Sequence, residues 1–279
     1  MQKIGAHVSA AGGARNAPIN AHAEKCETFQ FFINPPQTYK FKRLTKEEIE
    51  AFHANCQQYG FDEYYVHASY LMNLASLQNK IRYGAITLLK KALEESDKLG
   101  VKGVIFHAGT AKGHPNKAAA IKQAIKSMNI VLDGYTGKTK LVIENSAGAG
   151  TTLGVTFKEV AQMLKGIKDQ TKAAVCLDTQ HAFASGYDWR TPTATNKTLN
   201  EFSKEIGMRK LLVVHYNDSK SELSSNIDRH AHIAAGHLGV DAAKNILYHP
   251  KLQNKSFILE TPREGRAKDI KTLKQLRKG

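Results

Sequence analysis

The sequence predicts an α/β fold in which the whole chain, residues 1–279, forms a single (β/α)8 barrel. First, short apolar segments typical of strands alternate eight times with segments of helical periodicity. Second, a length of 279 residues suits a barrel domain, which takes about 250 residues. Third, no segment rich in Pro, Gly or Ser interrupts the alternation, so no linker between domains is expected.

The strand candidates share a short apolar core. They cover residues 3–9, 28–33, 63–69, 103–108, 140–146, 173–179, 210–218 and 256–262. The helix candidates follow them in turn, at residues 14–25, 45–60, 80–100, 116–133, 156–167, 196–207, 239–248 and 266–278. An open doubly wound sheet would show the same alternation. However, no Gly-x-Gly-x-x-Gly follows the first strand, and the chain has no Gly-x-x-x-x-Gly-Lys-Ser/Thr loop for phosphate.

Two helix candidates carry clear start and stop signals. Thr45 followed by Glu48 forms a capping-box pattern, in which each side chain satisfies a backbone N–H of the first turn. Gly60 suits the end of the same helix, because glycine readily adopts the left-handed conformation that closes a helix. The long helix candidate ends in the same way at Gly100.

The charge balance favours a polyanionic partner. The chain has 40 Lys and Arg against 25 Asp and Glu, which gives a formal net charge of +15. Such a surface attracts nucleic acid, although many basic proteins simply have a solvated cationic surface. The charge therefore limits the class of partner without naming a substrate.

The cysteines and the N-terminal segment indicate a cytoplasmic protein. Cys26, Cys56 and Cys176 form no Cys-x-x-Cys pair, which suits a reducing compartment without structural disulfides. The first residues, MQKIGAHVSAAGG, lack the continuous apolar core of a signal peptide. No run approaches the roughly 18 apolar residues of a membrane span. We therefore expect a soluble protein that has no membrane partner.

Side chains that bind metals occur at the ends of six predicted strands. They are His67, His107, Glu144, Asp178, His215 and Glu260. The C-terminal ends of parallel strands meet at the mouth of a barrel, so these side chains are expected to converge there. A lone His after a strand is usually a packed core or rim residue. Six such side chains at the same position relative to their strands indicate a metal site. A buried ionisable group without a partner costs on the order of a few kcal/mol, and a metal ion supplies that partner.

Two further clusters extend the set to nine. In DTQHAF, His181 follows Asp178 by three residues, and in IDRHAH, Asp228 and His230 are two apart and share a face of an extended segment. One metal ion takes about three or four protein ligands, so nine indicate two or three ions with at least one bridging carboxylate. The unpatterned cysteines leave nitrogen and oxygen as the expected ligand atoms. His7, at the end of the first strand, is expected to line the same pocket.

The segments that carry these residues resemble the signature segments of endonuclease IV, the zinc-dependent apurinic/apyrimidinic endonuclease family of base excision repair. The matching strings are GAHVSAAGG, VHASYLMNLAS, FHAGT, IENSAG, LDTQHAFASGYD, HYNDSK, DRHAH and LETP, in order from Gly5 to Pro262. The resemblance implies a single TIM barrel with three Zn²⁺ ions that cuts duplex DNA 5′ to an abasic site and leaves a 3′-hydroxyl. It also implies repair of blocked 3′ ends, and we expect a monomer.

The resemblance assigns the nine ligands to three sites. His67 and His107 resemble the ligands of the first zinc, Glu144 the bridge to the second, Asp178, His215 and Glu260 the rest of the second site, and His181, Asp228 and His230 the third. A hydroxide shared by the first two ions, beside Glu144, is the expected nucleophile, because zinc lowers the pKa of bound water to about 7. No covalent intermediate with the protein is needed.

The DNA contacts follow the family pattern only in part. Tyr70 and Leu71 match residues that in the family press into the DNA beside the abasic gap. By contrast, where the family commonly has an Arg after Asn34, this chain reads PPQTY, and we expect Tyr39 to stack in the DNA instead. The alternative, that Tyr39 packs on Phe41 and nearby lysines without reaching DNA, stays open.

Two rival functions are also compatible with part of the sequence. Sugar isomerases and epimerases of the same barrel class bind one or two divalent metals through Glu, Asp, His and Glu, and Glu144, Asp178, His215 and Glu260 alone would suit that function. The five further ligands and the basic charge argue against it, because a neutral sugar gains nothing from a positive field. A non-catalytic DNA-binding module would have no need for the metal ligands.

Overall fold

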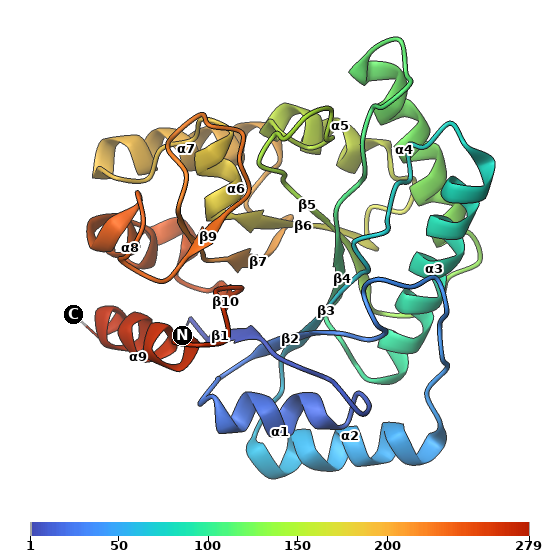
Figure 1. Ribbon diagram of the computed structural model, residues 1–279, viewed down its shortest axis with the longest axis horizontal. Helices are drawn as coiled ribbons and strands as arrows, with labels where there is room; N and C mark the ends of the chain where they lie inside the picture. The colour runs from blue at the N-terminus through green and yellow to red at the C-terminus, as the bar shows by residue number, and fades with distance from the viewer. Residues whose placement is uncertain (1, 279) are drawn as a thin grey trace.

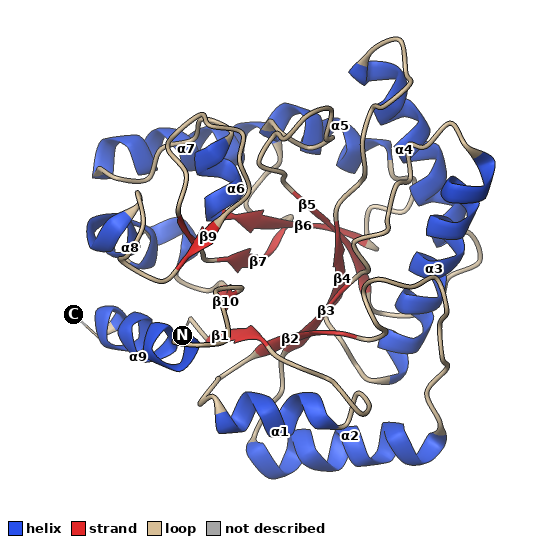
Figure 2. Cartoon of the chain, viewed as in Figure 1, coloured by secondary structure: helices blue, strands red, loops and turns tan. Residues whose placement is uncertain are grey.

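The computed structural model describes residues 2–278 and confirms the predicted barrel (Figures 1 and 2). Within these residues, eight parallel strands close on themselves in the order β1-β2-β3-β4-β5-β6-β7-β10. They are β1 (Ile4–His7), β2 (Phe29–Phe32), β3 (Tyr64–His67), β4 (Gly103–Phe106), β5 (Lys140–Glu144), β6 (Ala173–Asp178), β7 (Leu211–His215) and β10 (Ser256–Leu259). A short antiparallel pair, β8 (Asp218–Ser219) and β9 (His230–Ala231), lies outside the barrel.

Helices surround the barrel and cover the outer faces of its strands (Figure 2). They are α1 (Asn16–Ala23), α2 (Lys46–Tyr59), α3 (Asn79–Lys98), α4 (Lys117–Leu132), α5 (Phe157–Gly166), α6 (Thr179–Ala184), α7 (Pro192–Glu205), α8 (Gly239–Leu247) and α9 (Arg266–Arg277), with a 3-10 turn, η1, at Pro250–Leu252. No helix among residues 2–278 is long and apolar enough to span a bilayer.

The Thr45 half of the predicted capping box of α2 is present, whereas the Glu48 carboxylate accepts a hydrogen bond from the Ala14 N–H at 2.8 Å instead. The Thr45 hydroxyl accepts a hydrogen bond from the Glu48 N–H at 3.2 Å, and Gly60 closes the helix with a φ of 72°. On the inner side of α2, the Phe52 ring packs against the Phe29 and Phe31 rings of β2, with centroids 6.3 and 5.7 Å apart. This packing buries the apolar face of the helix and joins it to the barrel.

The inside of the barrel explains where the ionisable residues lie. A separate apolar cluster fills it, with Tyr65, Ile105, Val142, Cys176, Val213 and Ile258 among its members. Each of these residues precedes a predicted metal ligand by two positions. Because side chains two apart on a strand point to the same face, the ligands point into the barrel one layer above this cluster, at its C-terminal mouth.

Several boundaries differ from the predicted ones. Helix α7 begins at Pro192 instead of residue 196, because Thr191 caps it and proline is tolerated in the first turn. The predicted strand at residues 210–218 ends at His215, and Asp218 pairs with β9 instead. Helix α6 was not predicted, because all six of its residues are buried and no exposed polar face marks the helical period.

Candidate metal centre

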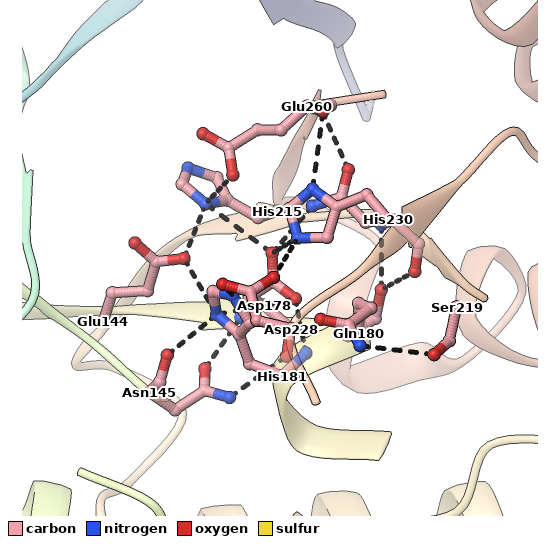
Figure 3. Close-up of polar contacts among 12 residues, drawn as sticks. Glu144, Asn145, Asp178, Gln180, His181, His215, Ser219, Asp228, His230 and Glu260 are labelled. Atoms are coloured by element: carbon pink, nitrogen blue, oxygen red, sulfur yellow. Dashed lines mark hydrogen bonds and ion pairs between the residues drawn. The ribbon is translucent and has the colours of Figure 1, made fainter. Parts of the chain in front are cut away.

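The nine predicted ligands lie together at the mouth of the barrel. Figure 3 labels those of the second and third groups, which are Glu144, Asp178, His181, His215, Asp228, His230 and Glu260. The first group joins β3, β4 and β5. His67 Nε2 lies 3.1 Å and His107 Nε2 lies 3.4 Å from Oε2 of Glu144. The glutamate and His67 are buried, whereas the His107 side chain is 33% exposed, so this group is open to water on the His107 side.

The second group shares Glu144 with the first. His215 Nδ1 lies 2.9 Å from Glu144 Oε1, 3.3 Å from Glu260 Oε2 and 3.9 Å from Asp178 Oδ2. One ligand atom from each of these four residues lies within 4.8 Å of all the others. Three carboxylates around one imidazole would repel one another unless a cation lay between them.

The third group lies at the outer edge of the mouth. Asp178, His181 and His230 bring ligand atoms within 4.8 Å of one another. Asp228 approaches from the loop between β8 and β9, with Oδ2 3.3 Å from His181 Nε2 and Oδ1 3.5 Å from His230 Nε2. Asp178 therefore borders both the second and the third groups, a sharing that the sequence did not indicate.

Four of the five histidines turn one ring nitrogen to a fixed carbonyl oxygen and the other to the carboxylates. The contacts run from Nδ1 of His67 to the Ala68 carbonyl (2.7 Å), from Nδ1 of His181 to the Asn145 carbonyl (3.0 Å), from Nδ1 of His230 to the Glu260 carbonyl (3.4 Å) and from Nε2 of His215 to the Gln30 amide oxygen (2.7 Å). A carbonyl can only accept, so each of these nitrogens carries the proton. The other nitrogen is the one that can offer a lone pair to a metal, once any proton on it is released.

Gln30 is a site residue that the sequence analysis missed. It is buried on β2, its oxygen accepts from His215, and its Nε2 donates to Glu260 Oε1 at 2.7 Å and contacts His7 Nδ1 at 2.9 Å. The available signal was a polar residue inside the otherwise aromatic strand Phe29–Phe32.

Two asparagines complete the support of the second group. Asn217 Nδ2 donates to Asp178 Oδ2 at 2.7 Å, and Asn217 Oδ1 accepts from the Glu260 N–H at 2.8 Å. Asn145 accepts from the Asp178 N–H at 2.8 Å and donates to its carbonyl at 3.1 Å. Both asparagines stand in the strings IENS and HYND, beside Glu144 and His215, but sequence alone did not assign them these contacts.

Burial and mutual attraction shift the titration of the cluster in the metal-free protein. Burial opposes the charge on His181, but Asp178, Asp228 and Glu144 outweigh it and raise the pKa of this ring well above the ordinary value. Burial likewise opposes the charge on His215, but Cys176, Glu260 and Glu144 raise its pKa well above the ordinary value. Burial would raise the pKa of Glu144, whereas His107 and His215 hold it well below its usual range. The pKa of Glu260 is low for the same reason. Protons on the histidines thus balance the carboxylates where cations are absent.

The residues present fit divalent metal ions. Among the described residues, Nε2 of His230 is buried without a hydrogen-bond partner, and it faces the carboxylates of Asp228 and Asp178. The donor set of imidazole nitrogens and carboxylate oxygens suits zinc, and the protonated side of four imidazoles is already occupied by carbonyls. This arrangement could bind several cations and hold a negatively charged group above them.

A cavity of about 520 Å³ opens above the cluster. Its lining includes His7, Tyr70, Arg229 and Arg266 together with six of the predicted ligands. The ring of His7 lies 4.3 Å from that of Phe32, and His7 Nε2 has no hydrogen-bond partner among the described residues. Arg266 is buried and pairs with Glu24, so the exposed guanidinium group beside the ionisable cluster is that of Arg229.

Of the predicted DNA-contact residues, Tyr70 lines this opening. Tyr70, three residues after β3, is 66% exposed, and its ring meets Phe32 edge-on at 5.2 Å. Leu71 is half-buried beside it. Tyr39 is 47% exposed, and its hydroxyl donates to the Leu71 carbonyl at 3.0 Å. Tyr39 is thus tied to the Tyr70–Leu71 segment, a link that neither alternative for this residue anticipated.

Comparison with known proteins gives three findings. Residues 20–278 match a family model described as a xylose isomerase-like TIM barrel. A probable endonuclease 4 of Halothermothrix orenii is 36% identical over 279 residues, which cover 99% of this chain and 99% of the relative. The crystal structure of endonuclease IV from Thermus thermophilus superposes with a TM-score of 0.88 at 31% identity, covering 99% of both chains.

The same barrel also occurs in proteins of other activity. A D-tagatose 3-epimerase-like protein superposes with a TM-score of 0.74, and the match covers 99% of this chain and 97% of that one. At 15% identity this likeness shows the fold alone.

Proposed function

The chain belongs to the endonuclease IV family, and on this basis we propose that it hydrolyses the phosphodiester bond 5′ to an abasic site in duplex DNA and leaves a 3′-hydroxyl. Repair of blocked 3′ ends is part of the same proposal. One observation carries this proposal. Nine His, Asp and Glu side chains, which come from separate elements and can bind metal ions, meet in three adjoining groups. We further infer that the whole chain acts as one domain and as a cytoplasmic monomer.

Three zinc ions would be held by the three groups described above. His67, His107 and Glu144 would hold the first, Glu144, Asp178, His215 and Glu260 the second, and His181, Asp228 and His230 the third. Zinc at such a site lowers the pKa of a water molecule and stabilises negative charge on a phosphate. The protein then needs no serine or cysteine nucleophile.

The protein side chains would bind and orient the DNA. Arg229 lines the cavity with an exposed side chain whose guanidinium group suits a phosphate, whereas the Arg266 guanidinium is held by Glu24. Glu144, ionised by its histidine neighbours, keeps the first two groups at a fixed separation. Tyr70 and Leu71 stand at the rim, where they would fill the gap left by the missing base, and Tyr39 would add a ring beside them. The cavity volume of about 520 Å³ is ample for an extruded sugar-phosphate.

A divalent-metal sugar isomerase or epimerase is the alternative that the fold allows. Its metal site would need only Glu144, Asp178, His215 and Glu260. The first and third groups have no place in that function, and a net charge of +15 does not help to bind a neutral sugar.

Incision of an abasic duplex tests the proposal directly. Purified protein is incubated with an end-labelled duplex that contains one tetrahydrofuran abasic analogue, with the same duplex lacking the lesion as control. We expect a single cut 5′ to the analogue, a product end that a DNA polymerase extends, and loss of cutting in excess chelator. An end that no polymerase extends, no cutting at all, or epimerisation of a ketohexose by the same preparation would overturn the proposal.

A further inference from the structure

The third group of the metal centre depends on a loop that has little regular structure of its own. Residues 220–229, here called the Asp228 loop, connect β8 to β9. Ser224 and Asn226 have φ values of 64° and 57°, which side chains other than glycine seldom adopt. The Asp228 side chain is 54% exposed. Contacts from outside the loop must therefore hold this conformation.

Gln180 supplies such a contact from the middle of α6. Its side chain is fully buried, and Nε2 lies 2.9 Å from the Ile227 carbonyl, directly before Asp228. The same nitrogen lies 3.2 Å from Ser219 Oγ and 3.3 Å from Ser221 Oγ (Figure 3 draws Gln180 beside Ser219). Because the Ile227 carbonyl can only accept, the amide nitrogen of Gln180 must face the loop.

The end of α6 holds the other side of the loop. The Phe183 carbonyl accepts from the Ser224 N–H at 3.2 Å, and the Ala184 carbonyl accepts from the Asn226 N–H at 2.9 Å. These are the two residues with positive φ, so carbonyls at the helix end bind the strained part of the loop. Helix α6 thus contacts the loop through its buried face and through its C-terminus.

The same helix provides the histidine that faces Asp228. His181 directly follows Gln180, and its Nε2 lies 3.3 Å from Asp228 Oδ2. The His181 N–H donates to Asp178 Oδ1 at 2.7 Å, where Asp178 caps the helix. One short helix therefore places His181 directly and Asp228 through Gln180.

We propose that Gln180 is a positioning residue that locks the Asp228 loop onto α6, so that Asp228 and His181 are aligned before a metal ion binds. This inference rests on the proposed function for the assignment of the third ion, but the locking of the loop does not. Loss of the Gln180 donor should release Asp228 and weaken the third site, while the first and second groups, which lie on barrel strands, keep their geometry.

Limited proteolysis of the metal-free protein tests the lock. Lys220 and Arg229 are exposed at the two ends of the loop, so trypsin can report its opening at both. We expect Gln180→Met, which keeps the volume and removes the donor, to be cut there roughly fivefold faster than wild type, as for the loss of one hydrogen bond. Gln170→Met is the matched control, since it removes two amide hydrogen bonds to backbone carbonyls after α5, far from the loop.

A second variant keeps the test decisive if Gln180→Met does not fold. Ser221 Oγ donates to the same Ile227 carbonyl at 2.8 Å from the partly exposed side of the loop, so Ser221→Ala should also speed cutting, by a smaller factor. Equal cutting rates in wild type and in whichever of the two variants fold would overturn the lock.

Zinc titration separates the lock from the proposed function. We expect the last of the bound zinc ions to dissociate about 10- to 100-fold more readily from Gln180→Met than from wild type, with the others unchanged. If wild type binds zinc and incises abasic duplex while Gln180→Met retains every ion equally tightly, the positioning role is refuted and the proposed function stands. If wild type binds no zinc and does not incise, the proposed function fails, and the proteolysis still decides whether Gln180 holds the loop.

Discussion

The amide oxygen of Gln30 lies 2.7 Å from Nε2 of His215, and this contact decides which imidazole nitrogen faces the carboxylates. Nδ1 of His215 therefore faces the carboxylates of Glu144, Glu260 and Asp178. The same amide donates to Glu260, so one side chain from β2 fixes two members of the second group.

Replacement of Gln30 should therefore weaken zinc binding without removing a ligand. We expect Gln30→Leu to lower the affinity of one site about 10- to 100-fold, because the His215 ring loses its fixed orientation. Competition with a chromophoric chelator measures the change, and Gln57→Leu, at an exposed position on α2, serves as control. An unaltered affinity in Gln30→Leu would contradict this role.

Glu144 should matter to more than one ion. We expect the purified protein to bind close to three metal ions, mainly zinc, and Glu144→Ala to lose more than one of them, since this carboxylate borders two groups. Activity should fall by roughly several powers of ten, as when a catalytic unit is dismantled. Elemental analysis together with the incision assay checks both. A single bound ion in an active wild-type enzyme is incompatible with this arrangement.

Zinc binding should release protons and strengthen with pH. The pKa values of His181 and His215 are raised in the metal-free protein, so each ring holds its second proton to a higher pH than an ordinary imidazole and must release it to bind a metal. Calorimetry in buffers of different ionisation enthalpy measures the release. Binding at pH 7 without proton release would show that the two rings are neutral in the metal-free state.

The same shifts set the pH range in which the metal-free protein is stable. The raised pKa values of His181 and His215 contribute to the free energy of unfolding. This contribution is fully present below about pH 6.5, the unfolded-state pKa of histidine, and is lost as the pH rises through the pKa values of the folded state. Stability from the lowered pKa values of Glu144 and Glu260 is present above about pH 4.5 and is lost as the pH falls through theirs. Thermal melts across pH, with and without zinc, should show that zinc stabilises most on the alkaline side.

The net charge predicts salt-sensitive DNA binding. We expect the logarithm of the affinity for duplex DNA to fall linearly with the logarithm of salt concentration, with a slope of about 0.9 per phosphate neutralised. At fixed salt, abasic duplex should bind more tightly than intact duplex, because a nucleotide without its base is easier to extrude. Fluorescence anisotropy at several salt concentrations measures both. An affinity independent of salt would leave the charge of +15 unexplained by DNA.

Tyr39 and Tyr70 should differ in how they act on DNA. Tyr70→Ala should cost roughly 1–3 kcal/mol of affinity for abasic duplex, as for one stacking contact. Tyr39→Phe removes only the hydrogen bond to Leu71, whereas Tyr39→Ala removes the ring as well. If Tyr39 stacks on DNA, the alanine variant will bind more weakly than the phenylalanine variant. If Tyr39→Phe and Tyr39→Ala both keep DNA affinity and incision rate within twofold of wild type, Tyr39 does not contact the DNA, and the contact is made by Tyr70 and Leu71.

Six of the nine predicted metal ligands could be identified because each ends or follows an apolar barrel strand on its inward side. His67 and Glu144 stand two positions after the core residues Tyr65 and Val142, a pattern visible in one dimension. The roles of Gln30 and Gln180 could not be predicted, because each depends on partners that are distant in the chain and meet it only after the barrel closes. Helix α6 was missed because burial on every side removes the periodicity that marks a helix.

The two-residue offset between core and ligand layers limits where the chain can change length. Removal of one residue from β5, between Val142 and Glu144, would turn the carboxylate out of the barrel toward the helices. Insertions in the Asp228 loop or around Tyr39 would leave the side chains of every barrel strand pointing in the same direction as before. Lineages can therefore alter the segments that meet the substrate by gain and loss of residues, whereas the strands beneath accept only substitutions.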